Sequence, residues 1–320
     1  GAYLINCARG GLVDEKAAAE AVREGRLSGI AFDVYTCEPL TKDHPFLAKD
    51  IEDRIVITPH LGASTEEAQT EVAKIAAENM IAALRGEPYE HAVNLPFLEQ
   101  KLNKTQKAFL QLSRKMGVLG AKLAEVECGA VHACHIMLRG DLFCEEEPMP
   151  NRLCAYSIAV LKGLFEVSRG PEVSYMLAPL LAKDSGLTVD EGFGEARTYK
   201  NTVELTLDAE KCSIHLIGTI TEEGRMRIVK VNDYWLDFVP NGKLILFQNH
   251  DRPGVIGKIG NILGESKINI ANFALGRKDN SGLALGALEV DSDIDEETKK
   301  KLEKSGDMIW LTMIDFTEAR

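Results

Sequence analysis

Three short apolar runs near the start of the chain constrain its fold most strongly. They cover residues 2–5, 29–34 and 55–57, and a helix-like segment or a loop lies between them. Strand, helix and strand joined by short connections predict a parallel sheet with right-handed crossovers. The carboxyl ends of parallel strands meet at one edge of a sheet, so polar side chains at the ends of these runs or shortly after them are expected to share one crevice.

Four such polar residues are Arg9, Asp33, Glu38 and His60. An imidazole can move a proton near neutral pH, and a neighbouring carboxylate stabilises its protonated form. A guanidinium can bind a substrate carboxylate through two hydrogen bonds. This set would suit oxidation of a hydroxyl group beside a carboxylate, with a hydride passing to a nicotinamide. The alternatives are a structural loop histidine for His60 and a loop-pairing acid for Asp33.

Three motifs resemble those of the D-2-hydroxyacid dehydrogenase family, and most closely its phosphoglycerate dehydrogenases. The motifs are LINCARGGLVDE at 4–15, AFDV at 31–34 followed by Glu38-Pro39, and TPHLGAS at 58–64. The resemblance implies that Arg9 binds the substrate carboxylate, that His60 is the general acid/base and that Glu38 orients it. It also implies that NAD lies in the same crevice, against Cys7, Ala8, Arg9, Asp33, His60 and Gly62.

The glycine-rich GxGxxG loop, which binds the pyrophosphate of a dinucleotide, does not precede these motifs. The chain begins at Gly1, without a methionine, and enters an apolar run at once. We therefore expect it to be the C-terminal part of a longer protein, with any targeting segment lost. Alone, it is expected to bind NAD weakly or not at all and to be inactive.

The middle of the chain, residues 95–240, shows helix-like runs at 102–123, 151–168 and 171–183 and an alternating, strand-like run at 126–138. Four further alternating runs, typical of antiparallel strands, follow. Helix and sheet without a strand–helix–strand rhythm predict an α+β domain. Residues 159–164, 178–183 and 218–220 resemble the intervening domain of long phosphoglycerate dehydrogenases. In some members, that domain is associated with regulation by anions or substrate. A structural spacer that supports oligomerisation is the alternative.

The last segment, residues 241–320, has the order strand, helix, strand, strand, helix, strand, which predicts a ferredoxin-like fold. NHDRPGVIG at 249–257 and INIA at 268–271 resemble an ACT domain, the amino-acid-sensing module. The resemblance implies that Asn249, Asp251 and Asn269 bind an effector such as L-serine near a helix N-terminus. Local turn formation by Asp251 and Asn269 is the alternative. ACT domains commonly pair, so a homo-oligomer, dimer or tetramer, is expected.

Composition argues against two classes of partner. The formal net charge of −12 argues against a nucleic-acid surface or an acidic lipid surface, and no apolar run is long enough to span a membrane.

Seven cysteines without a CxxC pair favour reduced thiols in a cytoplasmic compartment. Cys128 and Cys134 alternate with His132 and His135, which would permit a metal site, but a strand without metal is the preferred interpretation.

The predicted fold class is therefore α/β and α+β. Residues 1–94 are expected to form the C-terminal part of a Rossmann-like nucleotide-binding domain with its crossover helix, 95–240 an intervening domain and 241–320 an ACT domain. The resemblance implies NAD-dependent oxidation of 3-phospho-D-glycerate, or a similar 2-hydroxy acid, in L-serine synthesis, with regulation by serine. The alternative is a non-catalytic, amino-acid-sensing regulatory protein.

Overall fold

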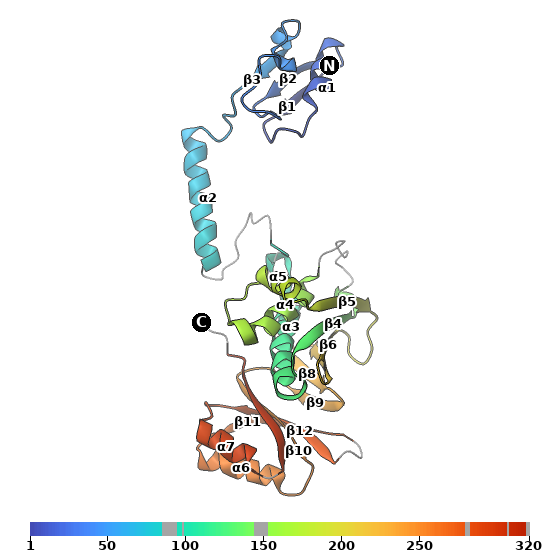
Figure 1. Cartoon of the computed structure of the whole chain (residues 1–320), viewed down its shortest axis with the longest axis vertical. Helices are drawn as coiled ribbons and strands as arrows, with labels where there is room; N and C mark the ends of the chain where they lie inside the picture. Colours follow the sequence, from blue (N-terminus) through green and yellow to red (C-terminus); the bar gives the residue numbers. More distant parts are fainter. Residues whose placement is uncertain (85–94, 98, 144–152, 279–281, 306, 318–320) are drawn as a thin grey trace. The chain divides into compact units, whose positions relative to one another are not determined.

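The computed structural model describes residues 1–84, 95–97, 99–143, 153–278, 282–305 and 307–317 (Figure 1). The chain divides into two compact units, residues 1–92 and 93–320, and each is described by itself. The domain boundary predicted at residue 94 lies outside the described residues, as do Gly86 and Pro88, which were expected to end the crossover helix. Within the described ranges, no helix combines the length and the apolar character that crossing a membrane requires.

The first unit contains a three-stranded parallel sheet of order β1-β2-β3, as the sequence predicts. Its strands are β1 (Ala2–Asn6), β2 (Leu27–Phe32) and β3 (Ile55–Ile57), and its helices are α1 (Glu15–Arg23), α2 (Glu66–Leu84) and the 3₁₀ turns η1 (Pro45–Leu47) and η2 (Glu52–Arg54). Asp14 caps α1 by accepting the N–H of Ala17. Buried apolar residues of α1, β2 and the 3₁₀ segments form the core of this unit.

The second unit is built on a six-stranded sheet and a four-stranded sheet. The six-stranded sheet has the order β5-β4-β6-β7-β8-β9, with β4 and β5 parallel and the other pairs antiparallel. Its strands are β4 (Val131–Arg139), β5 (Thr188–Gly194), β6 (Thr202–Ala209), β7 (Ser213–Ile220), β8 (Met226–Val231) and β9 (Tyr234–Phe238).

Two long helices, α3 (Lys104–Leu123) and α4 (Ala155–Arg169), lie side by side next to this sheet (Figure 1). A short 3₁₀ turn, η3 (Glu99–Lys101), precedes α3, another, η5 (Asp141–Phe143), follows β4, and α5 (Leu177–Asp184) packs on α4. A Cβ atom at Gly163 would lie 1.9 Å from the carbonyl oxygen of Arg114. Glycine at this position therefore sets how closely α3 and α4 can approach.

The four-stranded antiparallel sheet has the order β11-β12-β10-β13 and carries two helices. Its elements are β10 (Lys243–His250), α6 (Val255–Glu265), β11 (Ile270–Arg277), β12 (Leu283–Val290), α7 (Glu296–Glu303) and β13 (Met308–Asp315). Alternate residues of β10 face opposite ways. Ile245 and Phe247 pack with α6, whereas Leu244 and Leu246 belong to the core of the six-stranded sheet. The two sheets therefore share one hydrophobic core.

The predicted fold class is confirmed, but three elements differ from the sequence-based prediction. The strand expected from Val126 begins only at Val131, because residues Ala124–Cys128 continue α3 as a π-helical turn, η4, closed by the bond from the Gly129 N–H to the Ala124 oxygen. The helix expected from Pro171 begins at Leu177. Strand β5 was missed because its glycines and acids are depleted in strands, and pairing with β4 overrides that preference.

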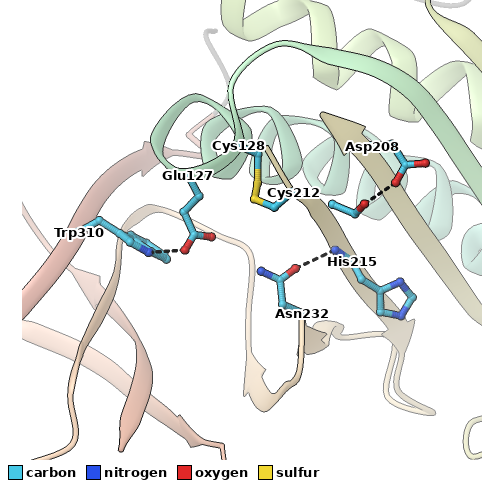
Figure 2. Close-up of a disulfide and its surroundings, with 8 residues drawn as sticks. Glu127, Cys128, Asp208, Cys212, His215, Asn232 and Trp310 are labelled. Atoms are coloured by element: carbon cyan, nitrogen blue, oxygen red, sulfur yellow. Dashed lines mark hydrogen bonds between the residues drawn. A yellow bond between two sulfur atoms is a disulfide. The ribbon is translucent and has the colours of Figure 1, made fainter. Parts of the chain in front are cut away.

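The prediction that all cysteines are reduced is wrong for Cys128 and Cys212. They form a disulfide across 84 residues of sequence, with Cα atoms 5.0 Å apart (Figure 2). Sequence spacing does not show which cysteines meet in space, so this pairing could not be found from the chain alone. His135 lies 3.1 Å from each of the carboxylates of Asp190 and Asp208. Cys128 and His135, two members of the Cys/His cluster considered from the sequence as a metal site, thus have other partners.

Candidate functional site

His60 lies in the loop after β3, at the carboxyl edge of the parallel sheet. Its φ of +56° falls in the left-handed region, which is uncommon for a residue other than glycine and often marks a functional position. Its Nδ1 atom lies 2.8 Å from Oε2 of Glu38, and Oε1 of Glu38 accepts the N–H of Tyr35 at 2.9 Å. The structure thus brings together two of the three predicted catalytic residues.

The charge of Glu38 determines which nitrogen of His60 is available for chemistry. Its hydrogen bond to His60, followed by that to Tyr35, lowers the pKa of Glu38, so the carboxylate is ionised at neutral pH. An ionised carboxylate only accepts hydrogen bonds, so Nδ1 of the imidazole must donate. Nε2 of the neutral ring then carries a lone pair that can accept a proton from a bound hydroxyl group.

Asp33, at the end of β2, holds the backbone of the His60 loop. Its Oδ1 atom accepts the Thr58 hydroxyl at 2.5 Å and the Leu61 N–H at 2.8 Å, and its Oδ2 atom accepts the Gly62 N–H at 2.8 Å. The bond from Thr58 contributes most to lowering the pKa of Asp33. A carboxylate has about four lone-pair positions, so Oδ2 can accept one further donor.

Arg9 follows β1 at the same edge, because Asn6, Phe32 and Ile57 are in register across the sheet. The buried Asn6 side chain shapes this loop: it accepts the Ala8 N–H and donates to the Arg9 carbonyl, both at 3.1 Å. The Arg9 side chain is exposed, and its Nη1 donates to the Ala8 carbonyl at 2.8 Å. Arg9 therefore lies at the expected edge, with its guanidinium bonded to its own loop.

Sequence reasoning missed a third carboxylate behind the site, that of Glu15. Its Oε1 atom accepts the Thr36 N–H at 2.7 Å, and its Oε2 atom lies 3.0 Å from Nε2 of His44. Nδ1 of His44 accepts the Phe46 N–H, so Nε2 carries the proton and donates to Glu15. These contacts fix the chain just before Glu38. An acid in the first turn of a helix is stabilised by the helix dipole, and the further role of Glu15 is visible only in three dimensions.

The residues at this edge fit the nicotinamide end of a dinucleotide. Oδ2 of Asp33 keeps an acceptor position that suits a carboxamide N–H, and Cys7, Ala8 and Gly62 are exposed residues of the strand-end loops at the same edge. A cavity of about 460 Å³ with a mostly apolar lining opens beside His60. An apolar lining with a few polar groups is usual for sites that bind small organic ligands.

In the second unit, Asn249 and Asp251 lie at the start of the turn that leads into α6. Asn249 is 2% exposed; its Nδ2 donates to the His250 carbonyl, and its buried Oδ1 accepts no hydrogen bond from the part of the chain that the structure describes. Asp251 lies 3.1 Å from the Arg277 guanidinium. Gly254 precedes α6 with φ +94° and no side chain caps this helix. Its first N–H groups can therefore face a carboxylate.

Asn269 does not join this cluster within one chain. Its amide donates to Asp291 at 2.7 Å, next to β12 residue Val290, which pairs with Lys243 of β10. Asn249 lies six residues further along β10. At the usual strand rise, this is a separation of roughly 20 Å. The three predicted effector residues thus occupy opposite ends of the four-stranded sheet.

Three family models match the chain in the order that the fold shows. The model of the D-isomer specific 2-hydroxyacid dehydrogenase, NAD binding domain, matches residues 1–62. That of the D-3-phosphoglycerate dehydrogenase intervening domain matches residues 105–232, and that of the ACT domain matches residues 243–307. The chain belongs to the D-3-phosphoglycerate dehydrogenase family. The first match confirms a nicotinamide dinucleotide as the cofactor of this family's parallel-sheet domain.

Relatives named D-3-phosphoglycerate dehydrogenase occur in archaea and bacteria. Those of Methanocaldococcus jannaschii and Archaeoglobus fulgidus are each 34% identical and cover 95% and 98% of this chain. The matched parts are 55% and 58% of those relatives, so the chain spans about half the length of the curated relatives it matches. A solved probable 2-hydroxyacid dehydrogenase from Rhizobium etli, in complex with NADP, HEPES and L(+)-tartaric acid, is 33% identical. The match covers 28% of this chain and 26% of that chain, with a TM-score of 0.23.

Protonation of Asp33 should release the His60 loop. The folded-state pKa of Asp33 is lowered, so its stabilising effect is complete above the ordinary carboxyl pKa of about 3.9 and is lost as the pH falls through the lowered value. We expect the amide NMR signals of Leu61 and Gly62 to shift together in that acidic range, and Asp33→Asn to abolish the shift. Asp43→Asn, which alters an exposed carboxyl outside the loop, is the matched control. A shift that persists in Asp33→Asn would contradict this assignment.

Proposed function

We propose that the protein containing this chain is an NAD-dependent dehydrogenase that oxidises 3-phospho-D-glycerate to 3-phosphohydroxypyruvate, a step in L-serine synthesis. The observation that carries the proposal is the 2.8 Å contact between Nδ1 of His60 and the ionised Glu38. This contact leaves Nε2 of His60 available as a proton acceptor. The choice of substrate is supported by the relatives' names and by the order of the three matched domains.

In this mechanism, Nε2 of His60 accepts the proton of the substrate hydroxyl group, while a hydride leaves the carbon atom that bears this hydroxyl. The Glu38 carboxylate stabilises the imidazolium that forms, and the exposed Arg9 guanidinium binds the neighbouring carboxylate of the substrate. Bound NAD would supply the hydride acceptor. Asp33, with the backbone of Cys7, Ala8 and Gly62, would hold its nicotinamide end. In the reverse direction, His60 returns the proton.

The alternative is a regulatory protein that senses an amino acid and has no catalytic role. The site favours the enzyme, because three elements of the first unit converge to fix one imidazole, and sensing by the second unit does not require this. The encoding gene offers a simple discriminating observation. A GxGxxG loop upstream of residue 1 supports the dehydrogenase, and a gene product without such a loop supports the regulatory protein.

Substitutions in the complete gene product test the catalytic proposal. We expect His60→Ala to lower kcat by about 10²–10⁴-fold, the usual contribution of a general acid/base. Arg9→Ala should mainly lower kcat/KM for 3-phospho-D-glycerate. The matched control is Arg26→Ala, which removes an exposed arginine paired with Glu24. Steady-state NADH formation measures all three, with circular dichroism to confirm folding. Unchanged turnover in His60→Ala would refute the assigned role.

We also propose that the ACT domain binds L-serine in a site completed by a second copy of the chain. The buried Oδ1 of Asn249 supports a ligand, because an unsatisfied buried acceptor costs about 1–3 kcal/mol unless something donates to it. The position of Asn269 at the other end of the sheet supports the second copy, because one serine cannot reach both ends. A homodimer, alone or within a tetramer, would bring Asn249 and Asp251 of one chain to Asn269 of another.

Complementation of two variants tests this arrangement. Asn249→Ala and Asn269→Ala, each alone, should abolish serine binding in calorimetry. When the two variants are co-expressed in equal amounts, mixed dimers should regain one of their two sites, so that about a quarter of the wild-type sites reappear. A homodimer site formed within one chain would give no recovery. Native serine affinity in either single variant would rule the site out.

A further inference from the structure

The disulfide joins two turns of the second unit that differ in accessibility (Figure 2). Cys128 ends the π-helical turn η4 and is 0% exposed, whereas Cys212, in the turn between β6 and β7, is exposed. A reductant can therefore approach the disulfide from the side of the exposed Cys212, while Cys128 stays inside the core. Exposure of one sulfur is what thiol–disulfide exchange requires.

The backbone keeps the two cysteines adjacent independently of the S–S bond. The Lys211 N–H donates to the Cys128 carbonyl at 2.9 Å, and the Glu210 N–H donates to the Ala130 carbonyl at 3.1 Å. Gly129 suits this turn, because its φ of +85° lies in the left-handed region that favours glycine. Opening of the disulfide would leave both thiols near one another, which favours its reformation.

The disulfide also lies beside the contact between the two sheets. Glu127, the residue before Cys128, accepts a hydrogen bond from Nε1 of Trp310 at 2.5 Å, as Figure 2 shows. Trp310 belongs to β13 of the ACT domain. Both residues are half-buried; burial raises the pKa of Glu127, and the bond from Trp310 partly offsets this rise. Any displacement of η4 would be transmitted to the ACT domain through this bond.

We propose that Cys128–Cys212 is a redox modification site, opened by a dithiol reductant, whose state sets how firmly the ACT domain is held to the six-stranded sheet. Nothing in this proposal depends on the dehydrogenase activity. When the disulfide is closed, it ties η4 to the β6–β7 turn and holds Glu127 against Trp310. When it is open, η4 loses its covalent tie to the β6–β7 turn, and the bond to Trp310 weakens.

The chemistry is ordinary exchange between a dithiol and a disulfide. A thiolate of the reductant attacks Sγ of Cys212, the S–S bond breaks, and Cys128 leaves with the electron pair and takes up a proton. The second thiol of the reductant then attacks its own sulfur in the mixed disulfide and releases Cys212. Two protein thiols form as the reductant becomes a disulfide, so electrons and protons balance.

The other buried cysteines do not compete in this exchange. Burial raises the pKa of the Cys134 and Cys154 thiols to about 12, so neither forms the reactive thiolate at neutral pH. Over the described parts of the chain, Cys128 and Cys212 are the cysteines joined as a pair. Among the cysteines of the described residues, reduction should therefore add two thiols, those of Cys128 and Cys212.

Trp310 fluorescence tests the proposal directly. The chain has two tryptophans, and Trp235 is exposed and stacks with Lys230, so a Trp235→Phe background leaves Trp310 as the reporter. Native protein is treated with dithiothreitol, and thiol titration, emission and acrylamide quenching are measured. We expect two additional thiols, red-shifted emission, stronger quenching and a fall in Tm of about 5–10 °C. Removal of the reductant in air should reverse all four.

Two variants separate the switch from a merely structural disulfide. Cys128→Ser with Cys212→Ser should show the spectrum of reduced protein with or without dithiothreitol. Glu127→Ala breaks the contact without touching sulfur, so it should show that spectrum while the disulfide is intact. The proposal is overturned if native protein gains no thiols, if two thiols appear while Trp310 emission and quenching stay unchanged, or if the disulfide does not reform.

Discussion

The conformation of the His60 loop depends on the carboxylate of Asp33. His60 has a backbone conformation that costs free energy for a residue with a side chain, so the loop needs compensating bonds. Asp33 provides them by accepting one hydroxyl and two backbone N–H groups from residues on both sides of His60. Glu38 then orients the ring that this backbone presents. The Asp33 carboxylate positions the loop, and the Glu38 carboxylate selects the tautomer of His60. A proton-transfer site requires both a fixed position and a defined tautomer.

The second unit is stabilised mainly by packing, because its two sheets share one hydrophobic core. Leu244 and Leu246 of β10 pack with the six-stranded sheet, while their neighbours in sequence pack with α6. The buried Lys115 of α3 adds a bond to the Pro240 carbonyl between the two sheets. Sequence similarity names an intervening domain and an ACT domain, but physically they form one compact unit. A change at the effector end or at the disulfide therefore has a continuous path of contacts to the other sheet.

The sequence predicted most of what depends on local pattern. Apolar runs and turn residues gave the parallel sheet and the ferredoxin-like order, and the Glu38–His60 contact followed from strand ends that share an edge. Contacts between distant segments could not be predicted. The Glu15–His44 pair, the Cys128–Cys212 disulfide and the separation of Asn249 from Asn269 each depend on how elements pack, and a single sequence carries no periodic signal for them. Strand β5 was missed because tertiary pairing outweighs its composition.

The central claim is that Glu38 fixes the proton of His60 on Nδ1 and so leaves Nε2 for the substrate. The most direct measurement is the proton NMR signal of the imidazole Nδ1–H in protein labelled with ¹⁵N-histidine. We expect a low-field Nδ1 proton for His60 that is protected from exchange in the wild-type protein and is lost in Glu38→Ala. The amide signals of Leu61 and Gly62 should stay in place in that variant. A wild-type ring that carries its proton on Nε2, or an Nδ1 proton that survives in Glu38→Ala, would contradict it.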